Sequence, residues 1–184
     1  MSYVFAKEEH GLGYAPEEVD EFIAIARQQF EDPNQSLVSS GAARRAVFHL
    51  VKGGYSISAV DSAIDRLEDT FANKEIRRQL ADQGEFALDD RLARFTDSLQ
   101  SRLNRPKKKR FSHAVWPLRG YSMKQVDTFC QNLERYLVSG ATMNASEVRN
   151  QLFKAKRGGY AENQVDAFLD RAVEVIQLRH ALGK

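Results

Sequence analysis

The stretch that decides the fold is Gly120-Tyr121-Ser122-Met123-Lys124-Gln125-Val126-Asp127. It consists of a Gly-Tyr pair, four further residues and a Val-Asp pair, and the same pattern starts again at Gly13, Gly54 and Gly159. The four tyrosines stand at positions 14, 55, 121 and 160, so they are 41, 66 and 39 residues apart. The copies therefore form two pairs, which is typical of an internal duplication of a tandem unit.

The spacing within each copy predicts a turn that leads into a helix. The glycine can take the positive φ that ends an incoming helix, and the valine falls where a hydrophobic staple would pack on the tyrosine. The residues expected at the N-caps are Ala15, Ser56, Ser122 and Ala161. Pro16 suits a first helical position, and Ser122 with Gln125 matches a capping box.

Apolar residues continue at helical spacing after every copy, and other segments show the same period. Helices are also expected from Ser39 or Ser40 to Gly53, and from Asn144 to Gly158. A further amphipathic helix is predicted over 87–103, where Leu88, Leu92, Phe95 and Leu99 follow one another at spacings of four, three and four. This apolar surface either packs on its neighbours or forms a coiled-coil contact with a second chain.

The sequence thus predicts an all-α fold of tandem helix-turn-helix repeats in two pairs, joined by an amphipathic helical segment. The expected divisions are 1–83 for the first pair, 84–106 for the connecting helix and linker, and 107–184 for the second pair. The nine residues from Phe30 to Ser39 can span about 30 Å, so the copies can pair within one chain. Pairing between two chains, as a homodimer, is the alternative.

With these residues in view, the chain resembles the N-terminal domain of DivIVA proteins and the related GpsB domain. The matching stretches are Arg119-Gly120-Tyr121 with Val126 to Phe129, Arg157 to Tyr160 with Val165 to Leu169, and Arg149 ahead of the last turn. The paired arrangement looks most like the multi-repeat DivIVA-domain proteins of actinobacteria. The resemblance implies a cytoplasmic bacterial adaptor of cell division or polar growth, although this chain has no long coiled coil after the domain.

The resemblance also implies a site for protein partners with Arg-containing segments. In GpsB-type domains the turn tyrosine and two carboxylates on the following helix receive an arginine of the partner. Transferred by position, these residues are Tyr55, Asp61 and Asp65 in the second copy and Tyr160, Asp166 and Asp170 in the fourth. The alternative is a solvated helix face, where an acidic residue near the N-terminus interacts well with the helix dipole.

A second candidate surface is basic and aromatic. The chain carries 27 Lys and Arg against 25 Asp and Glu, but residues 1–100 sum to 11 − 18 = −7 and residues 101–184 to 16 − 7 = +9. The membrane-binding candidates in the basic half are Lys107, Lys108, Lys109, Arg110, Trp116, Leu118 and Arg119. DivIVA binds membrane through an apolar residue and an arginine just before Gly-Tyr, which only the third copy keeps. The bland alternative is a solvated linker with Phe111 and Trp116 in the core.

Other chemistry finds little support in the sequence. The Gly-Gly pairs lack the ending of a phosphate loop, the four histidines have no i, i+4 pairing, and one cysteine excludes a Cys-based zinc site. No enzyme activity, metal or cofactor is therefore expected. The basic stretch could contact nucleic acid phosphates, but no recognition motif supports this, so a nucleic-acid-binding regulatory module is only the alternative function.

The expected location is the cytoplasm, peripheral to the inner face of the membrane at a pole or septum if the basic surface binds lipid. No apolar run approaches the roughly 20 residues that a membrane span needs. The N-terminus also lacks the basic and apolar regions of a secretory signal.

Overall fold

The computed structural model describes residues 5–31, 37–115 and 117–184. It is mostly helical and divides into two compact units, Met1–Arg78 and Gln79–Lys184. The first unit contains β1 (Leu12–Tyr14), α1 (Pro16–Glu31), α2 (Ser40–Arg44), β2 (Leu50–Lys52) and most of α3 (Ile57–Gln83). The second contains α4 (Glu85–Leu103), β3 (Arg119–Tyr121), α5 (Met123–Ser139), α6 (Ala145–Arg149), β4 (Ala155–Arg157) and α7 (Glu162–Leu182).

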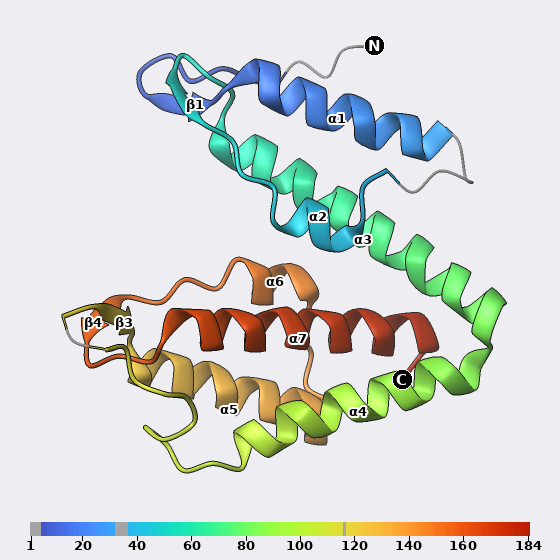
Figure 1. Ribbon diagram of the computed structural model, residues 1–184, viewed down its shortest axis with the longest axis vertical. Helices are drawn as coiled ribbons and strands as arrows, with labels where there is room; N and C mark the ends of the chain where they lie inside the picture. Colours follow the sequence, from blue (N-terminus) through green and yellow to red (C-terminus); the bar gives the residue numbers. More distant parts are fainter. Residues whose placement is uncertain (1–4, 32–36, 116) are drawn as a thin grey trace. The chain divides into compact units, whose positions relative to one another are not determined.

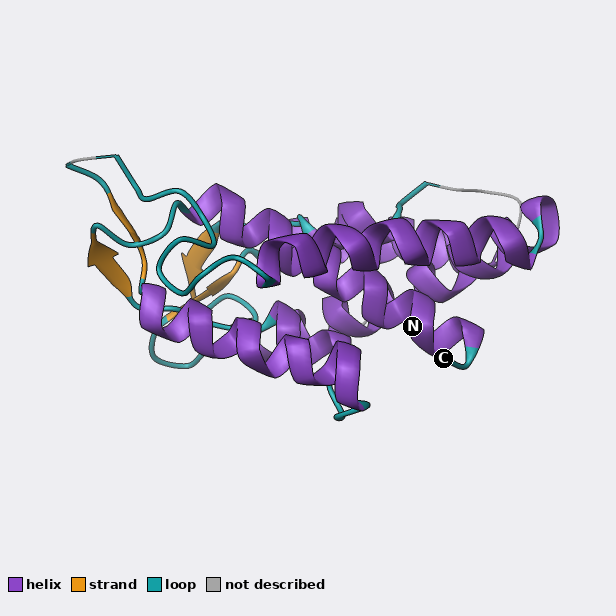
Figure 2. Ribbon diagram, turned by 90° about the horizontal axis from the view of Figure 1, so that it is seen from below, coloured by secondary structure: helices purple, strands orange, loops and turns teal. Residues whose placement is uncertain are grey.

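Each unit pairs two long helices, α1 with α3 and α5 with α7, and carries a small antiparallel sheet at one end of them (Figures 1 and 2). The order β-α-α-β-α occurs in both units, and in the second unit α4 precedes it. The segment predicted as a connection, 84–106, thus packs as part of the second unit. Leu88 and Leu99 are 1% exposed, and Leu92 and Phe95 pack against the same core, so the packing interpretation holds for this helix.

All four motif helices begin two residues after the motif tyrosine, at Pro16, Ile57, Met123 and Glu162, as predicted. The capping box at Ser122 and Gln125 is wrong, because the Ser122 side chain makes no cap hydrogen bond. The Gln125 side chain instead accepts a hydrogen bond from the Lys154 amide at 2.8 Å.

The helices predicted to reach Gly53 and Gly158 are much shorter than expected. α2 ends at Arg44 and α6 at Arg149, and the chain then runs extended into β2 and β4. The reason is that Phe48 must return to the turn, where its ring packs against Tyr14 and Phe22 at 5.4 and 5.8 Å. In the second unit Phe153 packs in the same way against Tyr121 and Phe129.

The two Gly-Tyr pairs of a unit lie face to face. The Tyr14 amide donates to the Tyr55 carbonyl at 2.9 Å, and the Tyr55 amide donates back to Tyr14 at 2.8 Å. Tyr121 and Tyr160 exchange the same two hydrogen bonds, both at 2.9 Å. In this structure the copies therefore pair within the chain.

The prediction that the motif glycines take positive φ is wrong. Gly53 and Gly158 take it, with φ of 67° and 65°, and they precede the motif glycines by one residue. Gly54 is needed for a different reason, because a Cβ there would lie 2.5 Å from two carbonyl oxygens of the opposite turn. The motif glycine permits two backbones to approach closely.

This crossing gives a stability prediction. Replacing Gly13 with alanine places a Cβ against the Tyr55 carbonyl, which is backbone and cannot rotate away. We expect Gly13→Ala to lower the free energy of unfolding by about 2 kcal/mol or more, measured by urea denaturation. The matched control is Gly11→Ala, which has open space and should change stability by less than about 0.5 kcal/mol. Equal effects of the two substitutions would contradict the crossing.

Candidate functional site

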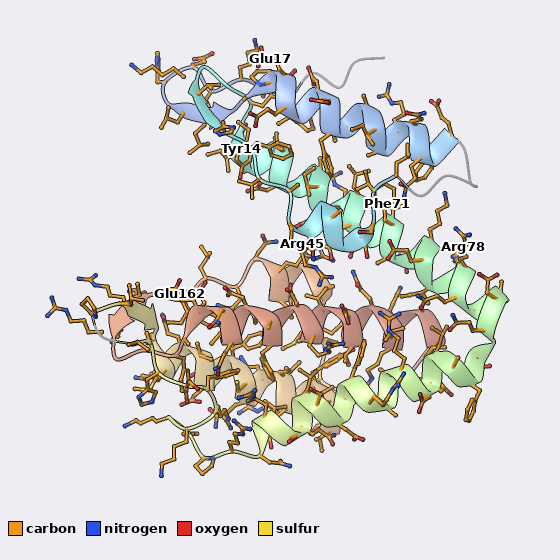
Figure 3. All side chains as sticks on the ribbon, in the orientation of Figure 1. Tyr14, Glu17, Arg45, Phe71, Arg78 and Glu162 are labelled. Carbon is orange, nitrogen blue, oxygen red and sulfur yellow. The ribbon has the colours of Figure 1, made fainter. Side chains whose placement is uncertain are left out.

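The paired turns place each motif tyrosine against the motif aspartate of the other copy. The Tyr55 hydroxyl donates to Asp20 at 3.1 Å, and the Tyr160 hydroxyl donates to Asp127 at 3.2 Å. The reciprocal pairs are also hydrogen-bonded, Tyr14 with Asp61 and Tyr121 with Asp166. Figure 3 shows Tyr14 beside the first turns of α3, the helix that contains Asp61.

The tyrosines and aspartates predicted to form one site within each copy are therefore paired differently in the structure. Tyr55 does not bond Asp61 of its own copy, and Tyr160 does not bond Asp166. Tyr55 and Tyr160 are 4% and 0% exposed, so their rings cannot receive a partner's side chain. Tyr14 and Tyr121 are less buried, and they are the tyrosines that contact Asp61 and Asp166.

The predicted carboxylates stay together as two pairs one helical turn apart, Asp61 with Asp65 on α3 and Asp166 with Asp170 on α7. Partial burial raises the pKa of Asp61, the bond from Tyr14 opposes this, and the Asp65 charge raises it further. Burial likewise raises the pKa of Asp166, with Glu162 and Asp170 adding to the effect. The helix ends around these two exposed side chains thus disfavour the charged form of each carboxylate.

One of the four Tyr–Asp pairs carries an arginine from the same chain. The Arg110 Nη1 atom lies 3.1 Å from the Asp127 carboxylate, and both side chains are almost fully buried. The Arg110 amide also donates to the Tyr160 hydroxyl at 3.3 Å, and its guanidinium donates to the Leu103 carbonyl. The Lys108 amide satisfies the second Asp127 oxygen at 2.9 Å.

The first unit differs at the corresponding position. Phe5 packs on Tyr55 at 5.4 Å as Phe111 packs on Tyr160 at 5.2 Å. The residue before Phe111 is Arg110, whereas the residue before Phe5 in the sequence is Val4, which lies outside the described residues. Within the described part of the chain, no basic side chain forms an ion pair with Asp20.

The membrane-binding candidates are divided by the structure. Lys107, Lys108 and Lys109 are exposed, but Arg110 is buried against Asp127, and Trp116 lies outside the described residues. Phe111 is 3% exposed and belongs to the core. Leu118 is 66% exposed, and the exposed Arg119 beside it lies directly opposite Arg157 in the β3–β4 ladder.

Two of these features have little signal in the amino-acid sequence. Nothing in a single motif tells whether its tyrosine faces its own aspartate or that of the other copy, and Arg110 reads as one more residue of a basic linker. The one available signal is that Phe5 and Phe111 stand at similar distances, nine and ten residues, before Tyr14 and Tyr121.

In the described residues no helix is long and apolar enough to cross a membrane, and no three acidic, His or Cys side chains gather as a metal site. Cys130 is buried, and burial raises its pKa to about 12. No family model, curated protein or solved structure matches this chain.

The two kinds of aspartate should respond differently to neutralisation. Asp127→Asn leaves the Arg110 charge buried without its partner, so we expect a loss of about 3 kcal/mol or more in unfolding free energy at pH 7. Asp166→Asn keeps an acceptor for Tyr121. The pKa of Asp166 is raised in the folded chain, so this side chain stabilises the fold more when it is protonated than when it is charged. Removing the charge should therefore leave stability at pH 7 equal or higher. Urea denaturation of both variants tests this, and equal losses would contradict it.

Proposed function

We propose that the chain is a non-enzymatic adaptor of the DivIVA-repeat type, which binds protein partners through arginine side chains. The observation that carries the proposal is the position of Arg110 on Asp127 and Tyr160. It is an example, within the same chain, of a Tyr–Asp pair whose carboxylate binds an arginine from the loop that follows α4. Pairs of the same chemistry without an internal arginine are candidates for an arginine supplied by another protein.

The sites proposed for the partner are Tyr14 with Asp61 and Asp65, and Tyr121 with Asp166 and Asp170. In the described part of the chain no basic side chain pairs with Asp61 or Asp166. A guanidinium can bond a carboxylate at two points and stack on an aromatic ring, which a lysine cannot do equally well. These features support an adaptor that binds arginine-containing segments; the proposed setting, cell division or polar growth, rests on the resemblance.

Capture experiments test the partner site. The full chain on a resin should retain partners from a lysate of its native host, and Asp61→Ala with Asp166→Ala should reduce their retention by tenfold or more, because the partner's arginine then loses its carboxylate at both sites. The matched control is Asp97→Ala, an exposed aspartate on α4. Partners retained equally by both variants would contradict an arginine site at these positions, provided that circular dichroism shows unchanged helicity.

A second function, attachment to an anionic membrane surface, is supported by the β3–β4 end of the second unit. Val115 and Leu118 are 77% and 66% exposed there. Arg119 lies directly across the ladder from Arg157, and such like-charged neighbours destabilise a sheet unless an anion compensates them. Anionic headgroups could supply this compensation while the apolar side chains enter the interface.

Sedimentation with vesicles tests this attachment. The chain should sediment with vesicles of phosphatidylglycerol and phosphatidylcholine, but not with phosphatidylcholine alone. Arg119→Glu should weaken the binding by about tenfold or more, since each basic residue near an anionic surface contributes about 1 kcal/mol. Arg135→Glu, on the exposed side of α5, makes the same charge change away from this end. Equal binding by both variants would contradict attachment through this end. A shift of DNA or RNA mobility without vesicle binding would favour the nucleic-acid alternative.

A further inference from the structure

The groove between the two long helices is covered in the second unit. α4 lies along α5 and α7 (Figure 1), and its apolar residues join their core. Leu99 and Leu103 are 1% and 4% exposed. The guanidinium of Arg171, on α7, lies 3.7 Å from the centre of the Phe95 ring of α4. An amphipathic helix is thus the element that closes this groove.

The corresponding groove of the first unit is open. It lies between α1 and α3 and has a volume of about 950 Å³. α1 contributes Ile23 and Phe30, of which Phe30 is 61% exposed, and α3 contributes Ser62, Ala63 and Arg66. Among the described elements of the first unit, none corresponds to α4.

The two grooves can be compared position by position. Tyr55 and Tyr160 differ by 105 residues, and the same difference relates Ala63 to Phe168 and Arg66 to Arg171. Phe168 fills part of the covered groove, where it belongs to the core with Leu99. In the first unit Ala63 is too small to fill the space that Phe168 fills in the second. Arg66 is exposed and corresponds to Arg171, which stacks on the Phe95 ring in the second unit.

We propose that the groove between α1 and α3 binds an amphipathic helix of a protein partner. The helix carries large apolar side chains at the spacing of α4, which is four, three and four residues, and an aromatic side chain that stacks on Arg66. Covering Phe30 and filling the space beside Ala63 drive the association, because both remove apolar surface from water. This surface is separate from the Tyr–Asp sites, and its use does not depend on them.

A second copy of the chain fits the groove less well. Two such grooves placed face to face would oppose small side chains to small side chains, because Ser62 and Ala63 line α3. They would leave much of the 950 Å³ unfilled. The apolar face of α4 is already buried in its own unit, so a second copy cannot supply that helix without unpacking it.

A labelled peptide with the sequence of residues 85–103 is the probe. We expect it to bind the full chain saturably in fluorescence anisotropy. Ser62→Arg should weaken this binding at least tenfold, because a long charged side chain then occupies the groove. The Ser62 hydroxyl donates to the Ser58 carbonyl and the Ser62 carbonyl accepts from Arg66, both within the same helix, so helicity should be unchanged by circular dichroism. Ser98→Arg makes the same change at an exposed position of α4 and should leave binding unaltered.

A peptide with Phe95→Ala should bind more weakly, because it lacks the ring for Arg66.

Three results would overturn the proposal. The first is the absence of peptide binding. The second is binding that Ser62→Arg does not change, which would place the peptide in the groove of the second unit by exchange with α4. The third is self-association of the chain in sedimentation equilibrium that Ser62→Arg abolishes, which would make a second copy the occupant.

Discussion

The structure depends on one backbone contact, the exchange of two hydrogen bonds between the paired Gly-Tyr turns of each unit. This contact brings two peptide groups together where no side chain fits between them, so glycine is required on both sides. It also fixes the starting points of the two long helices relative to each other. Because the turns are crossed, every motif tyrosine faces the aspartate of the other helix, and the hydrogen bonds of the site follow from the crossing.

The two units use the same crossing but differ in what completes it. In the second unit Arg110 neutralises Asp127, and α4 covers the helix pair. In the described part of the first unit neither an arginine on Asp20 nor a covering helix is present. Equivalent positions have also changed in size, as with Phe168 and Ala63. In the second unit the chain's own residues therefore neutralise Asp127 and cover the groove between the long helices. In the described part of the first unit Asp20 and the corresponding groove remain uncovered.

The parts of this structure that depend on local sequence were predictable. Helix starts after the motifs, the helix start at Asn144, and the amphipathic α4 follow from residues close together in the chain. The three-residue strands did not follow, because their extended form is imposed by the opposite turn and by Phe48 and Phe153 packing on distant rings. The pairing of Tyr55 with Asp20 was equally hidden, since hydrogen bonds between copies depend on how the helices cross.

The charges at the turns bear on the binding role proposed for the remaining aspartates. A tyrosine hydroxyl can donate one hydrogen bond to a carboxylate, but it leaves the negative charge in place. At Asp127 the positive guanidinium of Arg110 lies 3.1 Å away and compensates the negative charge of the buried carboxylate. At Asp61 and Asp166 the raised pKa values record that the charge remains costly in the folded chain. Neutral side chains there would serve folding as well or better, which agrees with the arginine-binding role proposed for these exposed carboxylates.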